Sequence, residues 1–210
     1  WRSKDLKLGK LVAGSRPVPR ATSVASSNLL PRPADRWSAR PKGQFPMPFP
    51  ATHPALAPAL DAQGYREPTP VQAAVLAAPA DADLLVSAQT GSGKTVAFGL
   101  AIADQLLDGD NAPWTREPLC LVIAPTRELA IQVSKELGWL YASAGARVVT
   151  CVGGMDPMKE RRALQGGAHI VVGTPGRLRD HLERGALNLS ALRVAVLDAV
   201  VIDDESRVPV

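Results

Sequence analysis

One glycine-rich segment constrains the fold of this chain more than any other, and its sequence is Ala88-Gln89-Thr90-Gly91-Ser92-Gly93-Lys94-Thr95. An apolar run, Leu84 to Val86, comes before it, and a helix-prone run, Val96 to Leu107, follows it. This order of strand, loop and helix is typical of a phosphate-binding loop. The glycines let backbone N–H groups surround phosphate oxygens, and the helix adds the positive end of its dipole.

Two side chains of this loop have the chemistry that a bound nucleotide needs. Lys94 can reach the β- and γ-phosphates, and the Thr95 hydroxyl can ligate Mg²⁺. One departure is visible, because Ala88 stands where the generic pattern has its first glycine. The alternative is a Gly/Ser-rich turn that contains Gly-Lys-Thr without binding anything. The flanking strand and helix favour nucleotide binding.

Strand-like and helix-like runs alternate from about residue 54 onward. The strand-like runs are 83–87, 119–124, 147–152, 169–173 and 193–198, and the helical runs are 54–63, 69–78, 94–107, 127–143, 157–165 and 176–184. Alternation of this kind predicts an α/β fold with a parallel, doubly wound sheet. Ligands of such sheets bind beyond the carboxyl ends of the strands.

The first 46 residues differ from the rest of the chain. They hold ten basic residues against two aspartates, a net charge of +8, whereas the whole chain carries +4. Eight of the 19 prolines lie in residues 1–50, and proline opposes both helix and strand. We expect residues 1–46 to be mostly disordered. They are interpreted as a linker without function, an RNA-holding basic tail or an organelle transit peptide.

Composition excludes several other classes of protein. No apolar run approaches the ~20 residues that span a membrane, so we expect no membrane partner and a cytoplasmic protein. Cys120 and Cys151 each lie in an apolar, strand-like run, which predicts two buried, reduced thiols. No cluster of Cys and His has the spacing of metal ligands, and the three histidines are scattered.

Four further segments narrow the class of nucleotide-binding protein. In chain order they are Gly64-Tyr65-Arg66-Glu67-Pro68-Thr69-Pro70-Val71-Gln72, Pro125-Thr126-Arg127-Glu128-Leu129-Ala130, Gly153-Gly154 and Thr174-Pro175-Gly176-Arg177-Leu178. With the phosphate-binding loop, and in this spacing, they resemble the first RecA-like domain of a DEAD-box ATP-dependent RNA helicase. The resemblance covers about residues 54–198. It implies a RecA-like P-loop NTPase fold, with ATP and Mg²⁺ as cofactors and RNA as a partner.

The resemblance assigns Gln72 to recognition of the adenine edge, because its amide can both donate and accept. Tyr65, Pro68 and Thr69 are placed with it in the adenine pocket. Phe49 is the candidate for the aromatic residue that stacks on adenine in the family, and Phe45 is the other possibility. The alternative for Gln72 is an amide on a helix surface.

The resemblance implies that the other segments contact the RNA backbone without reading its sequence. The residues concerned are Pro125, Thr126, Arg127, Gly153, Gly154, Thr174, Pro175, Gly176 and Arg177. Part of this pattern has structural alternatives. Thr126 suits a helix N-cap, and Glu128 pairs with Arg177 in one of two interpretations left open. The charged run Lys159 to Arg162 is interpreted as a solvated helix face.

The family pattern breaks after Asp198. Ala199 stands where the family's Asp-Glu-Ala-Asp motif has glutamate, and Val201 replaces its second aspartate. Asp198 remains available to hold Mg²⁺, but Ala199 cannot polarise an attacking water. We interpret 47–198 as the ATP-binding domain and 199–210 as an aberrant tail, although Asp203-Asp204-Glu205 is an alternative, displaced acidic motif.

Three consequences are expected from this break. The chain is a fragment of a helicase whose second RecA-like domain lies elsewhere, and it hydrolyses ATP negligibly. A non-catalytic nucleotide- or RNA-binding module is the alternative, and a generic P-loop enzyme such as a small-molecule kinase is a third interpretation. We also expect the last strand to leave apolar side chains exposed at a sheet edge, namely Val194, Val196, Val200 and Val201.

Overall fold

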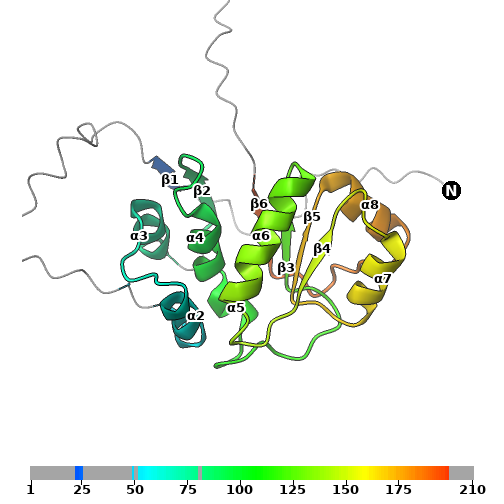
Figure 1. Cartoon of the computed structure of the whole chain (residues 1–210), viewed down its shortest axis with the longest axis horizontal. Helices are drawn as coiled ribbons and strands as arrows, with labels where there is room; N and C mark the ends of the chain where they lie inside the picture. Colours follow the sequence, from blue (N-terminus) through cyan, green and yellow to red (C-terminus); the bar gives the residue numbers. More distant parts are fainter. Residues whose placement is uncertain (1–21, 26–48, 50–51, 80–81, 199–210) are drawn as a thin grey trace, which may run out of the picture.

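The computed structural model describes residues 22–25, 49, 52–79 and 82–198 of the chain (Figure 1). Its strands are β1 (Thr22–Ala25), β2 (Leu84–Ser87), β3 (Cys120–Ile123), β4 (Val148–Cys151), β5 (Ile170–Gly173) and β6 (Val194–Leu197). Its helices are the short 3-10 helix η1 (Pro54–Leu56), α2 (Ala57–Ala62), α3 (Pro70–Leu76), α4 (Lys94–Ala101), α5 (Ala103–Leu106), α6 (Arg127–Leu140), α7 (Pro157–Gln165) and α8 (Pro175–Glu183). The five predicted strands β2–β6 form, and each end lies within one residue of its expected position.

Four strands make one parallel sheet in the order β4-β5-β3-β6. Alternate residues of the central strands point to opposite faces. Cys120 and Val122 of β3 belong to a buried cluster with residues of α4 and α6, whereas Leu121 belongs to a second cluster with residues of α7 and α8. The predicted α/β sheet is therefore confirmed, with helices on both faces (Figure 1).

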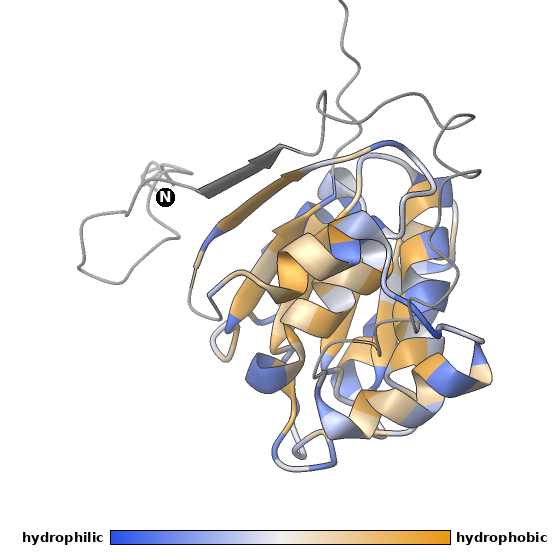
Figure 2. Cartoon of the chain, turned by 90° about the vertical axis from the view of Figure 1, so that its left-hand side faces the viewer, coloured by the Kyte–Doolittle hydropathy of each residue, from blue (hydrophilic) through white to orange (hydrophobic). Residues whose placement is uncertain are grey.

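One strand departs from the predicted single sheet. β2, which precedes the phosphate-binding loop, pairs in parallel with β1 in a separate two-stranded sheet. Leu84 and Val86 pack on a third buried cluster, which contains Val71 and Ala97, but Leu85 is 63% exposed. Figure 2 shows β2 as an apolar strand at the margin of the molecule. β2 thus pairs with β1 along one edge and packs one face on α3 and α4.

β1 lies inside the segment expected to be mostly disordered. Thr22–Ala25 has neither proline nor charge, and it contains the β-branched residues Thr22 and Val24. Such a segment can add to the edge of β2 through backbone hydrogen bonds, as its parallel register with Leu84–Ser87 indicates. These four residues form a strand within the segment that was expected to be mostly disordered. The remainder of 1–46 lies outside the described residues.

The exposed face of β6 was predicted incorrectly. Val194 and Val196 are half-buried and pack against the cluster that includes residues of α4 and α6. Because side chains alternate along a strand, the residues turned outward are Ala195 and Leu197, and Leu197 is 73% exposed. Val200 and Val201 lie outside the described residues.

Both cysteines are buried and unpaired by disulfides, as predicted. Burial raises the pKa of the Cys120 thiol to about 12. Among the described residues, no helix combines the length and the apolar character needed to cross a membrane.

Candidate nucleotide and RNA site

The predicted phosphate-binding loop leads directly into α4. Gly93 adopts φ of +86° and caps the helix, a conformation that glycine allows at no steric cost. The ammonium group of Lys94 crosses the loop, donating to the carbonyl oxygens of Ala88 at 2.5 Å and Gln89 at 2.8 Å. The first amides of α4 have no partner within the helix, so the loop presents both backbone donors and a cation.

The surroundings of the Ser92 hydroxyl indicate that the loop fits an anionic ligand. Its hydroxyl oxygen is the sole buried side-chain nitrogen or oxygen in the described part of the chain without a hydrogen-bond partner. Buried polar atoms are rarely left without partners unless a bound group completes them. The hydroxyl, the helix amides and Lys94 together form a donor set suited to phosphate.

The segment predicted to recognise adenine lies against this loop. The Thr69 hydroxyl donates to the carbonyl oxygen of Ser92 at 2.9 Å, and the Gln72 amide nitrogen donates to that of Gly93 at 3.4 Å. Gln72 is fully buried, and its amide oxygen accepts from the Thr69 backbone N–H at 2.9 Å in a capping box at the start of α3. The amide is thus not on a helix surface. Its contact with adenine stays a prediction.

Two other residues predicted for the adenine pocket, Tyr65 and Phe49, pack against the main core. Tyr65 stacks on Trp139 with ring centroids 5.7 Å apart. Burial, together with the nearby carboxylate of Glu136, raises the pKa of the Tyr65 hydroxyl. Phe49 packs against the main core, Pro68 is half-buried, and Phe45 lies outside the described residues.

Asp198 reaches the same edge of the molecule from β6. Its backbone N–H donates to the carbonyl oxygen of Ile123 at 2.9 Å, which extends the pairing of β6 with β3 by one residue. Burial raises the pKa of the Asp198 carboxyl, while the Lys94 ammonium acts in the opposite direction. Lys94 is therefore near enough to act on this carboxylate. Thr95 lies in the first turn of α4, and its role with Asp198 in binding Mg²⁺ stays a prediction.

A second group of predicted residues surrounds the loop after β4. Thr126 caps α6 by accepting from the Leu129 N–H at 3.2 Å, so its structural alternative is present. Arg127 donates to the carbonyl oxygen of Gly153 at 3.2 Å. Gly154 has φ of +78°, and a Cβ atom there would collide with the Arg127 guanidinium. A side chain at this position would strain the backbone and would displace the arginine.

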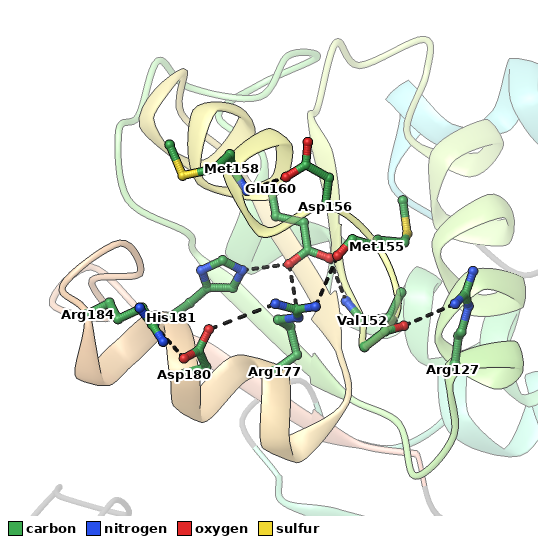
Figure 3. Close-up of polar contacts among 11 residues, drawn as sticks. Arg127, Val152, Met155, Asp156, Met158, Glu160, Arg177, Asp180, His181 and Arg184 are labelled. Carbon is green, nitrogen blue, oxygen red and sulfur yellow. Dashed lines mark hydrogen bonds and ion pairs between the residues drawn. The ribbon is translucent and has the colours of Figure 1, made fainter.

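Arg177 forms a different ion pair from the one considered in the sequence. Its Nε lies 3.4 Å from a carboxylate oxygen of Glu160, and its guanidinium donates to the carbonyl oxygen of Met155 at 3.1 Å (Figure 3). Asp180 lies farther away, at 3.9 Å. Glu128 is exposed, and among the described residues Arg177 has no ion pair with it. The interpretation with a Glu128–Arg177 pair is therefore wrong.

Glu160 was misassigned to a solvated face. It is 4% exposed, whereas Lys159, Arg161 and Arg162 around it are exposed. Its spacing to Leu164, also buried, is i to i+4, which puts the two on one face of α7. The sequence did contain a signal of this burial, namely the apolar Leu164 four residues after Glu160. A charged residue on the same helix face as a core residue points inward.

The remaining predicted residues line a groove between α7 and α8. The groove has a volume of about 780 Å³, and its walls include Gly153, Thr174, Gly176 and Arg177. Pro175 opens α8, and Pro125 lies exposed before α6. The structure thus brings together the segments predicted for RNA, from three separate regions of the sequence.

The fold and the loop before α4 define a P-loop α/β domain of the RecA-like class. The family profile described as DEAD/DEAH box helicase matches residues 69–207. The chain belongs to the DEAD/DEAH box helicase family.

Named relatives agree with this assignment. The ATP-dependent RNA helicase DeaD of Haemophilus influenzae is 49% identical over 138 residues, which cover 64% of this chain and 22% of that protein. The DEAD-box ATP-dependent RNA helicase CshA of Geobacillus kaustophilus is 43% identical over 141 residues, or 67% of this chain and 29% of that protein. A DeaD protein of Klebsiella pneumoniae is 46% identical over 142 residues. The aligned region of this chain spans between a fifth and a third of the relatives' length.

Proposed function

We propose that this chain binds ATP with Mg²⁺ and the backbone of RNA, as the nucleotide-binding part of an RNA helicase. The observation that carries the proposal is the contact between the Thr69–Gln72 segment and the phosphate-binding loop. A generic phosphate-binding loop needs no such partner, whereas hydrogen bonds from Thr69 to Ser92 and from Gln72 to Gly93 tie a base-recognition segment to it.

Lys94 and the amides of the loop hold the phosphates in this proposal, and the Thr95 hydroxyl and the Asp198 carboxylate hold Mg²⁺. The ion supplies charge neutralisation on the phosphate oxygens. Ala88, Gln89, Thr90, Gly91, Ser92 and Gly93 form the rest of the cradle. When Gln72 binds adenine, its amide gives up the hydrogen bond to the Gly93 carbonyl oxygen. At 3.4 Å this bond is the longer of the two that the side-chain amide makes.

RNA lies across the groove and the N-termini of α6 and α8. The Gly153 and Gly154 amides and the N-terminus of α8 face phosphate there, and Arg127 adds positive charge. These groups carry no base information, so binding is independent of sequence. The relatives are named as RNA helicases, which supports RNA as the polyanion.

Hydrolysis by this chain is slow in our proposal because Ala199 stands at the position of the motif's glutamate. In the intact helicase a second RecA-like domain closes on ATP and RNA and adds an arginine finger, which is worth about 10³–10⁵ in rate. The substitution at Ala199 also favours a second candidate function, a non-catalytic module that binds nucleotide and RNA.

Binding and turnover measurements on the same purified chain test the proposal. Fluorescent ATP and GTP analogues are titrated with Mg²⁺, single-stranded RNA is titrated at several salt concentrations, and phosphate release is followed with RNA present. We expect ATP to bind more tightly than GTP, RNA affinity to fall with salt, and phosphate release to stay at background. Preference for GTP or a lack of RNA binding would contradict the binding roles, and RNA-stimulated turnover at helicase rates would contradict the inactivity.

A further inference from the structure

A buried carboxylate lies beneath the groove proposed for RNA. Glu160 extends from α7, and its side chain is 3% exposed. One carboxylate oxygen accepts from the backbone N–H of Val152 at 3.0 Å. The other lies 2.6 Å from Nε2 of His181 and 3.4 Å from Nε of Arg177, both of α8 (Figure 3). This single side chain therefore connects α7, α8 and the end of β4.

The contacts of Glu160 hold the loop that follows β4 at two points. Val152 is the residue immediately before Gly153, and its N–H is fixed by the carboxylate directly. Met155 follows Gly154, and its carbonyl oxygen is fixed by Arg177, which Glu160 in turn orients. The Gly153–Gly154 pair is therefore held from both sides.

The loop that follows β4 leaves two of its backbone N–H groups available for a ligand. Among the described residues the backbone N–H groups of Gly153 and Gly154 have no hydrogen-bond acceptor, while the Gly153 carbonyl accepts from Arg127. Carbonyl oxygens thus turn toward arginines within the protein, and amides are left for an external acceptor. A glycine pair keeps such an orientation only if its neighbours are fixed, because glycine has the greatest backbone freedom.

We infer that Glu160 is a positioning residue for RNA binding: it orients Arg177 and the Gly153–Gly154 amides toward phosphate without touching RNA. The inference rests on the proposed RNA-binding function. It predicts an effect opposite to simple electrostatics, since removing a negative charge from a surface that binds a polyanion should otherwise strengthen binding. Burial of the carboxylate is tolerable because the Val152 N–H, the His181 ring nitrogen and the Arg177 guanidinium all contact it.

The test compares Glu160→Ala and Glu160→Gln with the matched control Glu183→Gln, which removes an exposed carboxylate from α8. Single-stranded RNA affinity is measured on the full chain, below the melting temperature of every variant. We expect Glu160→Ala to weaken binding by about tenfold, as for loss of one charge-assisted contact. Glu160→Gln keeps an acceptor for the Val152 N–H, so it should lose less RNA affinity than Glu160→Ala. The control stays within about twofold of the parent chain.

Two further readouts separate positioning from general destabilisation. The dependence of affinity on salt becomes shallower in Glu160→Ala, by up to about one phosphate contact, although the variant has gained positive net charge. In a double-mutant cycle with Arg177→Ala, the double variant loses scarcely more RNA affinity than either single variant, because both changes act on the same loop.

Unchanged or tighter RNA binding in Glu160→Ala would overturn the inference while leaving the proposed function intact, and so would multiplicative effects in the cycle. Failure of the parent chain itself to bind RNA would overturn both. If Glu160→Ala does not fold, Glu160→Gln decides: binding equal to that of Glu183→Gln, with an unchanged salt dependence, would contradict the role.

Discussion

The strand before the phosphate-binding loop and the central strands of the sheet are stabilised in different ways. β5 is buried at every position, between strands on both sides and helices on both faces. β2 pairs with β1, packs one face on α3 and α4, and leaves Leu85 exposed. The contrast indicates that β5 lies within a continuous apolar core, whereas β2 has apolar packing on one face only. The segments next to β2 add individual hydrogen bonds, such as those of Thr69, Gln72 and Lys94.

The largest expected effect compares two aliphatic side chains in the two strands. Ile170→Ala in β5 should lower the free energy of unfolding by about 2–5 kcal/mol, because the removed atoms leave a cavity in a fully buried site. Leu85→Ala in β2 should change it by no more than about 0.5 kcal/mol. Urea denaturation monitored by circular dichroism measures both. Equal losses would show that the two strands are stabilised alike.

The next effect concerns the hydrogen bonds of Lys94 in the phosphate-binding loop. Lys94→Ala should weaken ATP binding by about 10–100-fold, from a loss of roughly 1.5–3 kcal/mol for a charged hydrogen bond. RNA affinity in the absence of nucleotide should remain that of the parent chain, since Lys94 lies outside the groove between α7 and α8. Lys135→Ala, an exposed lysine of α6, is the control for charge. A similar loss in the control would contradict a specific role of Lys94.

The smallest expected effect separates stability from binding at Asp198. Its pKa is raised in the folded chain, so the ionised carboxylate destabilises the fold at pH values above that pKa, and protonation removes the cost at acidic pH. Asp198→Asn should therefore slightly raise the melting temperature at neutral pH, with the difference vanishing as the pH falls through the ordinary range of aspartate. The same variant should lose the tightening of ATP binding by Mg²⁺. A lower melting temperature at neutral pH would contradict this assignment.

Local sequence patterns were sufficient to predict much of the fold. The alternation of strand-like and helix-like runs predicted β2 to β6 with their ends. This was possible because hydrophobic periodicity and turn residues act over only a few neighbouring residues. The partner of β2 could not be predicted in this way, since sheet order depends on contacts between residues far apart in the chain. The strand Thr22–Ala25 in particular lies among prolines and basic residues that obscured it.

In the candidate site too, features set by local sequence were predictable and features set by tertiary contacts were not. The phosphate-binding loop and Thr126 are local structures of strand, loop and helix, and both formed as their sequences indicate. The environment of Arg177 depends on three elements meeting, so the choice of Glu160 over Glu128 as its partner needed the tertiary structure. His181 was missed for the same reason, although its spacing of three residues from buried Leu178 placed it on the inner face of α8.

The two cysteines give the molecule a pair of built-in reporters. Cys120 belongs to the core cluster on one face of the sheet and Cys151 to the cluster on the other. Burial raises the pKa of each thiol to about 12, so neither reacts appreciably with an alkylating reagent at neutral pH until its surroundings open. Alkylation rates of the two thiols, resolved by mass spectrometry of peptides, would therefore show whether the layers on the two faces open together or one before the other.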